Sequence, residues 1–150
     1  YKYLTYHHVL KFTNKDDVNY FCALSWYTEI DDVVHIKIMA VDLKQNQKSL
    51  LDAWKDVSDT NTDTNWAVFG YEGKTNVVKL VETGDNDLDD MVEELSSGKI
   101  MYAYCRVKDP NTGLFKFVLV NWQGEGAPDS RKGQCAPHFR DVQTLLRVCQ

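Results

Sequence analysis

The stretch KIMYAYCRVKDPNTGLFKFVLVNW, residues 99–122, decides the fold. Its two halves, residues 99–107 and 114–122, are rich in β-branched and aromatic residues and are apolar on both faces. Such runs predict two central strands of a sheet that is covered on both sides. Between them, Pro110 stands at the second position of a turn and Gly113 stands near its end, so the two strands are expected to form a hairpin.

The chain before this hairpin contains a second strand pair and two helices. Apolar residues at helical spacing predict a helix over residues 43–58. Residues 66–72 and 76–84 predict two strands joined by a short loop with a glycine. Residues 84–99 predict a second helix, because acidic N-cap candidates begin the segment and a glycine ends it.

A glycine-rich loop follows the hairpin and leads into a last helix. This loop carries Arg131 and Lys132, and the helix is expected to begin at about Ala136, with Pro137 in its first turn. The order helix, two strands, helix, two strands, helix predicts an α/β fold of the α+β type, in which a sheet packs on helices. The inner face of the last helix is predicted to consist of Phe139, Val142, Leu145, Leu146 and Cys149.

Composition limits the class of protein. The chain has 150 residues, of which 43% are hydrophobic, so it suits one folded domain. The net charge of −5 speaks against general nucleic-acid binding. No apolar run approaches the ~18 residues of a membrane span. The four cysteines form no CxxC pair, which favours reduced thiols in a cytoplasmic protein.

The candidate chemical motifs indicate neither an enzyme nor a metal site. Residues 124–143 lack the glycine, lysine and Ser/Thr spacing of a phosphate-binding loop. Cys135 and His138 form a C-x-x-H pair without two further zinc ligands at recognisable spacing. The position of Cys135 near a helix N-terminus, which would lower its pKa, is the one feature that suggests reactivity. The six acids from Asp85 to Glu94 are best explained as a solvated helix face. We therefore predict no catalytic residue, cofactor or metal.

Residues 1–38 differ from the rest of the chain. They are rich in aromatic residues, contain no Gly, Pro or Met, and show no sustained period. The first methionine is Met39, so residues 1–38 are interpreted as a leader of unknown origin and residues 39–150 as the domain. Within the leader, VVHIKI (residues 33–38) has the composition of a short strand. We expect that it could pair with an exposed edge of the sheet.

Several long motifs resemble the actin-depolymerising factor homology (ADF-H, cofilin-like) domain of drebrin-like proteins. The motifs are MAVDL, NWAVFGYEG, MVEELSSGKIMYAYCRVKDPNTG, KFVLVNWQGEG and RKGQCAPH, and the resemblance runs from Met39 to about Leu146. It implies a central mixed sheet sandwiched between helices. The family domain continues with a further strand and helix, so the resemblance also implies a domain truncated at its C-terminus.

The resemblance implies which residues contact actin. In cofilin-like proteins the contacts are a basic loop, the outer side of the helix after it, and the residues that follow the starting methionine. The filament-specific contact is a hairpin that carries Lys108 and Lys116 in this chain. The corresponding main contacts are Arg131, Lys132, His138, Arg140, Gln143, Ala40 and Val41.

The function implied is binding to actin, with filaments preferred over monomers. The drebrin-like branch resembles a filament side-binder without severing activity, in the cytoplasm and the actin-rich cell cortex, with roles in cytoskeletal organisation and endocytosis. Drebrin-like proteins also carry an SH3 domain that recruits endocytic partners, and this chain does not encode it. Two alternatives stay open: a monomer binder of the twinfilin or cofilin type, and a module that binds anionic lipids such as phosphoinositides.

Overall fold

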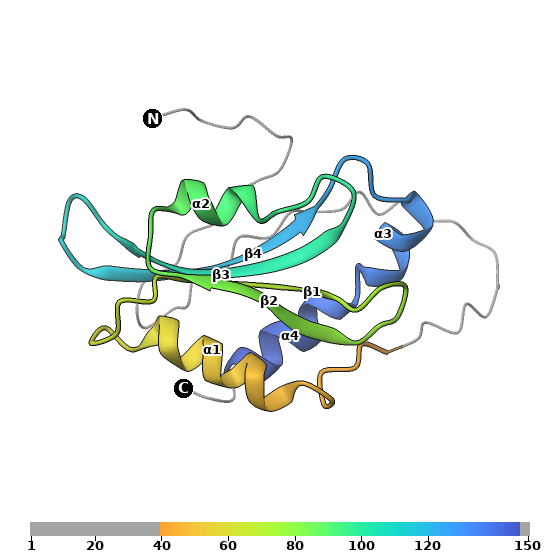
Figure 1. The fold of residues 1–150 in the computed structure, drawn as a ribbon, viewed down its shortest axis with the longest axis horizontal. Coiled ribbons are helices and arrows are strands. Elements are labelled where there is room, and N and C mark those ends of the chain that lie inside the picture. The colour runs from red at the N-terminus through yellow and green to blue at the C-terminus, as the bar shows by residue number, and fades with distance from the viewer. Residues whose placement is uncertain (1–39, 148–150) are drawn as a thin grey trace.

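The computed structural model describes residues 40–147 (Figure 1). The predicted leader, its VVHIKI segment and Cys149 lie outside the described residues. Four helices and four strands make up the described part. In chain order they are α1 (Gln47–Ser58), β1 (Trp66–Tyr71), β2 (Val78–Gly84), α2 (Leu88–Glu93), β3 (Ile100–Lys108), β4 (Phe115–Gln123), α3 (Asp129–Cys135) and α4 (His138–Arg147).

The strands form one sheet with the order β2-β1-β3-β4, and all three pairings between named strands are antiparallel. The β3–β4 register runs from Ile100 opposite Gln123 to Lys108 opposite Phe115. A single parallel bridge among the described residues joins Asp42 to Val77. The predicted fold class, a central sheet between helices, is confirmed. β3 is central as expected, whereas β4 lies at an edge of the described sheet.

Both predicted hairpins are present, and glycine explains both turns. Gly73, between β1 and β2, has a φ of 55°, and Gly113, between β3 and β4, has a φ of 70°. Non-glycine residues rarely adopt this left-handed region, so the two glycines allow the chain to reverse there. The turn chemistry in the sequence therefore fixed the pairing of neighbouring strands.

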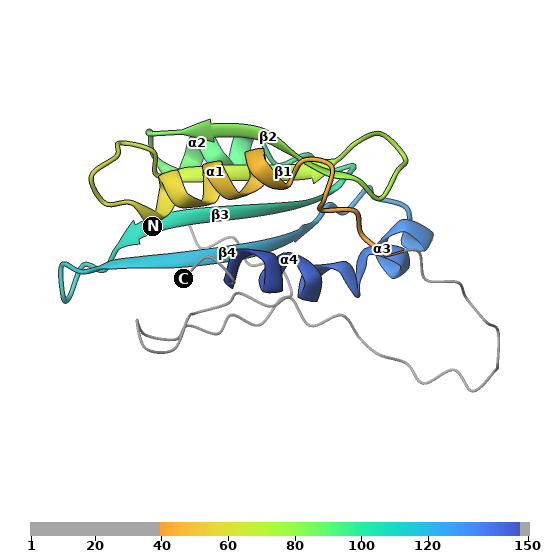
Figure 2. The same cartoon turned by 90° about the horizontal axis from the view of Figure 1, so that it is seen from below.

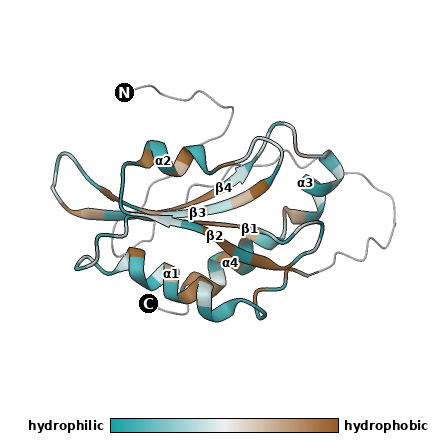
Figure 3. Cartoon of the chain, in the orientation of Figure 1, coloured by the Kyte–Doolittle hydropathy of each residue, from teal (hydrophilic) through white to brown (hydrophobic). Residues whose placement is uncertain are grey.

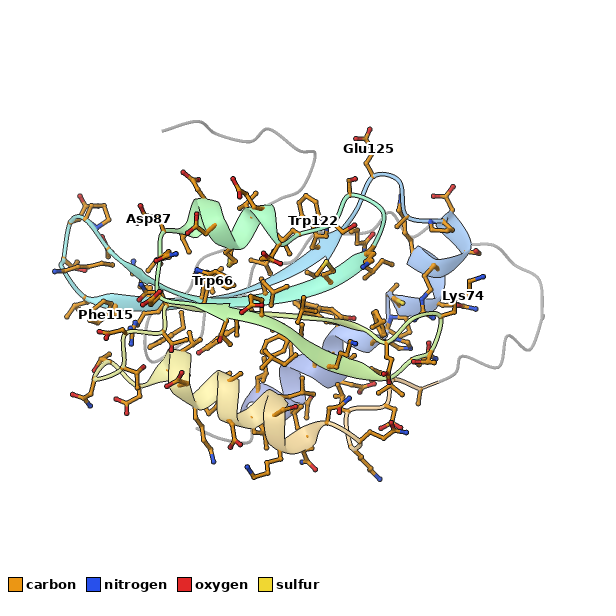
Figure 4. The ribbon with its side chains drawn as sticks, viewed as in Figure 1. Trp66, Lys74, Asp87, Phe115, Trp122 and Glu125 are labelled. Carbon is orange, nitrogen blue, oxygen red and sulfur yellow. The ribbon has the colours of Figure 1, made fainter. Side chains whose placement is uncertain are left out.

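The two faces of the sheet carry separate apolar clusters (Figures 1 and 2). Helices α1 and α4 cover one face, where Phe69, Tyr102 and Leu119 are each at most 2% exposed. Helix α2 covers the other face through Met91, which packs against Trp66 and neighbouring strand residues. Trp66 lies between the sheet and α2 in Figure 4, and Trp122 lies past the end of α2, where its indole N–H donates to the Ser96 carbonyl at 2.8 Å. Burial of one such side chain stabilises the fold by roughly 1.5–3 kcal/mol.

Helix α2 is shorter than the sequence pattern predicts. Leu88, Met91, Val92 and Leu95 are spaced as one apolar stripe of the predicted helix. In the structure Leu88 and Val92 are 37% and 38% exposed, and Met91 alone is buried among the residues of the helix. The helix ends early because the Leu95 amide donates to the Val92 carbonyl, three residues back, and the Ser96 amide bonds to the Met101 sulfur. These bonds tighten the chain into a turn that leads to β3.

Helix α3 was missed, and its presence corrects the predicted loop at Arg131 and Lys132. The Pro128 carbonyl accepts hydrogen bonds from the amides of both residues, at 2.9 and 3.0 Å, and this begins the helix. Pro137 then interrupts the helical hydrogen bonds because it has no N–H, so α4 starts at His138 rather than at Ala136.

Candidate functional site

The segment at Ala40 and Val41 is held beside the turn between β1 and β2. The Asp42 amide donates to the Asn76 carbonyl at 2.8 Å, and the Asp42 carbonyl accepts from the Val78 amide at 3.0 Å. Ala40 is exposed, and Val41 is half-buried against the core. The two predicted contact residues therefore have a fixed position next to this turn.

Arg131 of α3 also binds this turn. Its guanidinium donates to the Asn76 side-chain oxygen at 2.7 Å and to the Thr75 carbonyl. It also lies over the Tyr71 ring, with 4.6 Å between the guanidinium carbon and the ring centroid. Cation–π contacts of this kind add to the hydrogen bonds. Arg131 thus fixes α3 on the sheet, and its side chain is only partly available to a partner.

His138 is buried, so the prediction that it lies on the outer side of the last helix is wrong. It is 1% exposed, and its Nδ1 lies 2.8 Å from the Tyr71 hydroxyl. The same hydroxyl lies 2.7 Å from the Tyr102 hydroxyl. A buried polar ring needs hydrogen-bond partners, and this cluster supplies them. His138 therefore anchors the start of α4 to β1 and β3 and offers no contact surface.

The outer surface of α3 and α4 carries the remaining predicted contacts. Arg140 is exposed and Gln143 is partly exposed. Lys132 is half-buried, donates to the Glu125 carbonyl at 3.2 Å and lies 3.6 Å from an Asp129 carboxylate oxygen. Such a long, partly exposed ion pair holds the lysine weakly. We name Lys132, Arg140 and Gln143 the helix surface.

Lys108 and Lys116 lie at the opposite end of the sheet from α3. α3 contacts β3, whose residue Ile100 lies eight positions from Lys108, or roughly 26 Å along an extended strand. Lys108 is exposed, whereas Lys116 pairs with the Asp109 carboxylate at 2.6 Å. This hydrogen bond is the main cause, before that from the Asn111 amide, of a pKa of Asp109 lowered to about 2. The structure therefore separates the filament-specific candidates from the helix surface.

The cysteines of the described residues show no sign of reactivity. Cys135 is the last residue of α3, so the expectation that a helix N-terminus lowers its pKa is wrong. Burial instead raises its pKa, and burial raises the pKa of Cys105 to about 12. Among residues 40–147, no three or more His, Cys, Asp or Glu side chains gather in a way that could hold a metal ion. No helix in the same range is long and apolar enough to cross a membrane.

The tip of the β3–β4 hairpin has features that the sequence reasoning did not single out. Leu114 and Phe115 are 66% and 44% exposed, and a brown segment marks the hairpin end of β4 in Figure 3. Arg106 is 7% exposed beneath this tip, with its guanidinium carbon 5.2 Å from the centroid of the Phe115 ring. An arginine within an otherwise apolar strand is a sequence signal that could have indicated the contact between Arg106 and the hairpin tip.

Comparison with known proteins shows the family. The family described as cofilin/tropomyosin-type actin-binding protein matches residues 42–150. The fold agrees: human coactosin-like protein gives a TM-score of 0.62 at 18% identity, over 73% of this chain and 79% of that one. The cofilin homology domain of the yeast actin-binding protein ABP1P gives 0.61 at 20% identity, over 70% and 78%. The chain therefore belongs to the cofilin/tropomyosin-type actin-binding proteins.

Several of its curated relatives are drebrin-like proteins. Drebrin-like protein B of Xenopus laevis is 56% identical over 109 residues, which cover 73% of this chain and 29% of that protein. The drebrin-like protein of Mus musculus is 50% identical over 109 residues, which cover 73% of this chain and 25% of that protein. The chain thus spans less than a third of either relative and corresponds to their ADF-H domain.

Proposed function

We propose that this domain binds the side of actin filaments without severing them, in the cytoplasm and at the actin-rich cortex, where it serves cytoskeletal organisation and endocytosis. The observation that carries this proposal is the presence of two candidate contact surfaces at opposite ends of the sheet. Lys74, beside α3, and Phe115, at the hairpin, mark these ends in Figure 4. A filament offers two neighbouring subunits to such a pair of surfaces, whereas a monomer offers one.

In this proposal the helix surface makes the main contact. Lys132 and Arg140 supply positive charge toward an acidic partner, and Ala40 and Val41 extend the contact beyond the turn. Exposed charges of this kind accelerate association and set orientation more than they add affinity, at about 0.2–1 kcal/mol each. The hairpin, with Lys108 and the apolar tip, makes the second contact, which requires a filament.

Co-sedimentation with actin filaments tests this assignment. The double variant Lys132→Glu with Arg140→Glu is expected to weaken filament binding about tenfold and to reduce its dependence on salt. The matched control is Lys55→Glu with Lys79→Glu, which makes the same change of charge at exposed positions of α1 and β2. Equal losses in both double variants would show that overall charge, rather than the helix surface, determines binding.

A second pair of measurements separates filament binding from monomer binding. Lys108→Glu with Leu114→Ala is expected to weaken co-sedimentation several-fold while leaving nucleotide exchange on actin monomers unaffected. A variant that lost both to the same extent would favour the monomer binder of the twinfilin or cofilin type. Direct imaging of filaments with the unmodified domain tests the absence of severing, and an increase in filament ends would contradict it.

A further inference from the structure

A cavity of about 430 Å³ lies between the β1–β2 turn, the turn before β3, and α3. Its apolar lining includes the half-buried Tyr71 and the buried Ile100 and Ala127. Glycines in both turns, Gly73 and Gly98, add no side chain of their own to the lining, beside the flexible lysines that follow them. The site therefore has room for one or two side chains of a ligand and an apolar surface to contact them.

The charge of this cavity is opposite to that of the chain. Lys74, Lys99 and Arg131 line it, and no Asp or Glu is among the described residues that do so. Lys74 and Lys99 are exposed and lie on two different turns, whereas Arg131 lies on α3. The chain as a whole has a net charge of −5, so a lining with three cations and no acid is a local exception that attracts negative charge.

The donor groups favour carboxylates over a phosphate group. A phosphate site usually directs several backbone amides at the ligand. Here the amides of Arg131 and Lys132 already donate to the Pro128 carbonyl, and the Arg131 guanidinium already donates to Thr75 and Asn76. The cationic groups that remain for a ligand are the two flexible lysines, and the Ser130 hydroxyl and the Gln134 amide also line the cavity. Two separate lysines suit separate carboxylates on either side of an apolar group.

We propose that this cavity binds an acidic peptide segment of a protein partner, with an apolar side chain inserted against Tyr71 and Ile100 and acidic side chains paired with Lys74 and Lys99. Arg131 contributes its charge and forms one wall of the site. The site adjoins the helix surface but uses different side chains, so it offers a second binding function that operates without actin.

A blocked pentapeptide with a central phenylalanine and two acidic residues on each side is the probe, and the amide spectrum of the domain reports its binding. We expect saturable shifts at the amides of Ile100 and Ala127. A peptide with Asn and Gln in place of the acids should bind at least tenfold more weakly. Lys74→Glu with Lys99→Glu should have the same effect, whereas Lys55→Glu with Lys79→Glu should leave the affinity unchanged.

A filling variant tests the cavity independently of charge. Ser130→Trp adds bulk at a residue that lines the cavity, and Gly133→Trp adds the same side chain on the same helix at a position with open space and outside the lining. We expect the first to abolish peptide binding and the second to retain it. Folding of each variant is verified by its amide spectrum.

Three outcomes would overturn the proposal. The first is the absence of saturable shifts with the acidic peptide, and the second is an equal loss of affinity in both tryptophan variants. The third is saturable binding of inositol hexaphosphate without binding of the peptide, which would make the cavity a phosphate site. None of these measurements contains actin, so their failure leaves the proposed filament binding to be judged by co-sedimentation alone.

Discussion

Two arginines at opposite ends of the sheet stabilise the fold through similar hydrogen bonds and ring contacts, but they differ in exposure. Arg106, at the hairpin end, donates to the carbonyls of Asp59 and Thr62 and lies over Phe115. Arg131, at the α3 end, binds the β1–β2 turn and lies over Tyr71. Each joins the sheet to a segment distant in sequence, a loop for Arg106 and helix α3 for Arg131, and each contacts an aromatic ring.

The difference between them lies in what remains for a partner. Arg106 is 7% exposed, and its charge is used within the fold. Arg131 is half-exposed and also borders the cavity, so it serves the fold and a binding surface at once. A cationic side chain near a candidate interface is therefore weak evidence for contact with a partner until its internal hydrogen bonds are known.

The largest expected effect is the difference in stability loss between two apolar truncations, one near the α3 end of the sheet and one at the hairpin tip. Phe139→Ala removes a ring that is 6% exposed and stacks on Tyr102, so it should lower the free energy of unfolding by about 3–5 kcal/mol in urea titration. Leu114→Ala, at the exposed hairpin tip, should change it by less than about 0.5 kcal/mol. Similar losses in the two variants would show that the hairpin tip is packed in solution.

A smaller effect is expected where the buried arginine is replaced. Arg106→Lys retains the charge but removes the planar group that reaches two loop carbonyls and the Asn65 side chain at 3.1 Å. Loss of donors to these partly buried carbonyls should lower the free energy of unfolding by about 2–3 kcal/mol. Arg140→Lys on the exposed helix surface is the matched control, with an expected change within about 0.5 kcal/mol.

Much of the sheet could be predicted from the sequence because its signals are local. Residues 99–122 contain both strands and their turn, and Gly113 adopts the backbone conformation that the turn requires. The inner face of α4 follows from spacing, since Phe139, Val142 and Leu146 recur at helical intervals and are buried. These features depend on contacts between residues that are close in the chain.

The candidate site was harder to predict because its interactions join distant segments. Arg131 binds Thr75 and Asn76, which lie 56 and 55 residues away, and no local pattern reports such a bond. His138 was assigned to the outer side although its spacing of four from Val142 places it on the inner face, a signal that could have been used. α3 has seven residues and contains a glycine, so its sequence resembles a loop.

Replacement of the second arginine tests its dual role. Arg131→Lys should lower the free energy of unfolding by about 1 kcal/mol, less than Arg106→Lys, because Arg131 is half-exposed and water can replace part of its hydrogen bonding. The lysine retains the charge, so filament co-sedimentation at a temperature where the variant is folded should stay close to that of the unmodified domain. A stability loss as large as that of Arg106→Lys would remove the distinction between the two arginines.

The smallest expected effect is that of the ion pair at the hairpin, and it is measured through the pKa of Asp109 and the pH dependence of stability. The hydrogen bond from Lys116, with a further one from the Asn111 amide, holds the pKa of Asp109 at about 2, below its ordinary value of 3.8. Because the pKa is lower in the folded state, this carboxylate stabilises the fold above pH 3.8, and its contribution disappears as the pH falls toward 2. Lys116→Ala should raise the pKa of Asp109 toward 3.8 and make the stability of the domain less dependent on pH in that interval.

Carbon NMR of the Asp109 carboxyl group measures this shift directly. Lys108→Ala is the matched control because that exposed lysine belongs to the same hairpin and is not a partner in the ion pair between Lys116 and Asp109. The control should leave the pKa of Asp109 at about 2. If both variants raised the pKa equally, general positive charge at the hairpin rather than the hydrogen bond would be responsible. Lys116 would then be available to a filament. The hairpin would offer two accessible cations, Lys108 and Lys116, just as the helix surface offers Lys132 and Arg140.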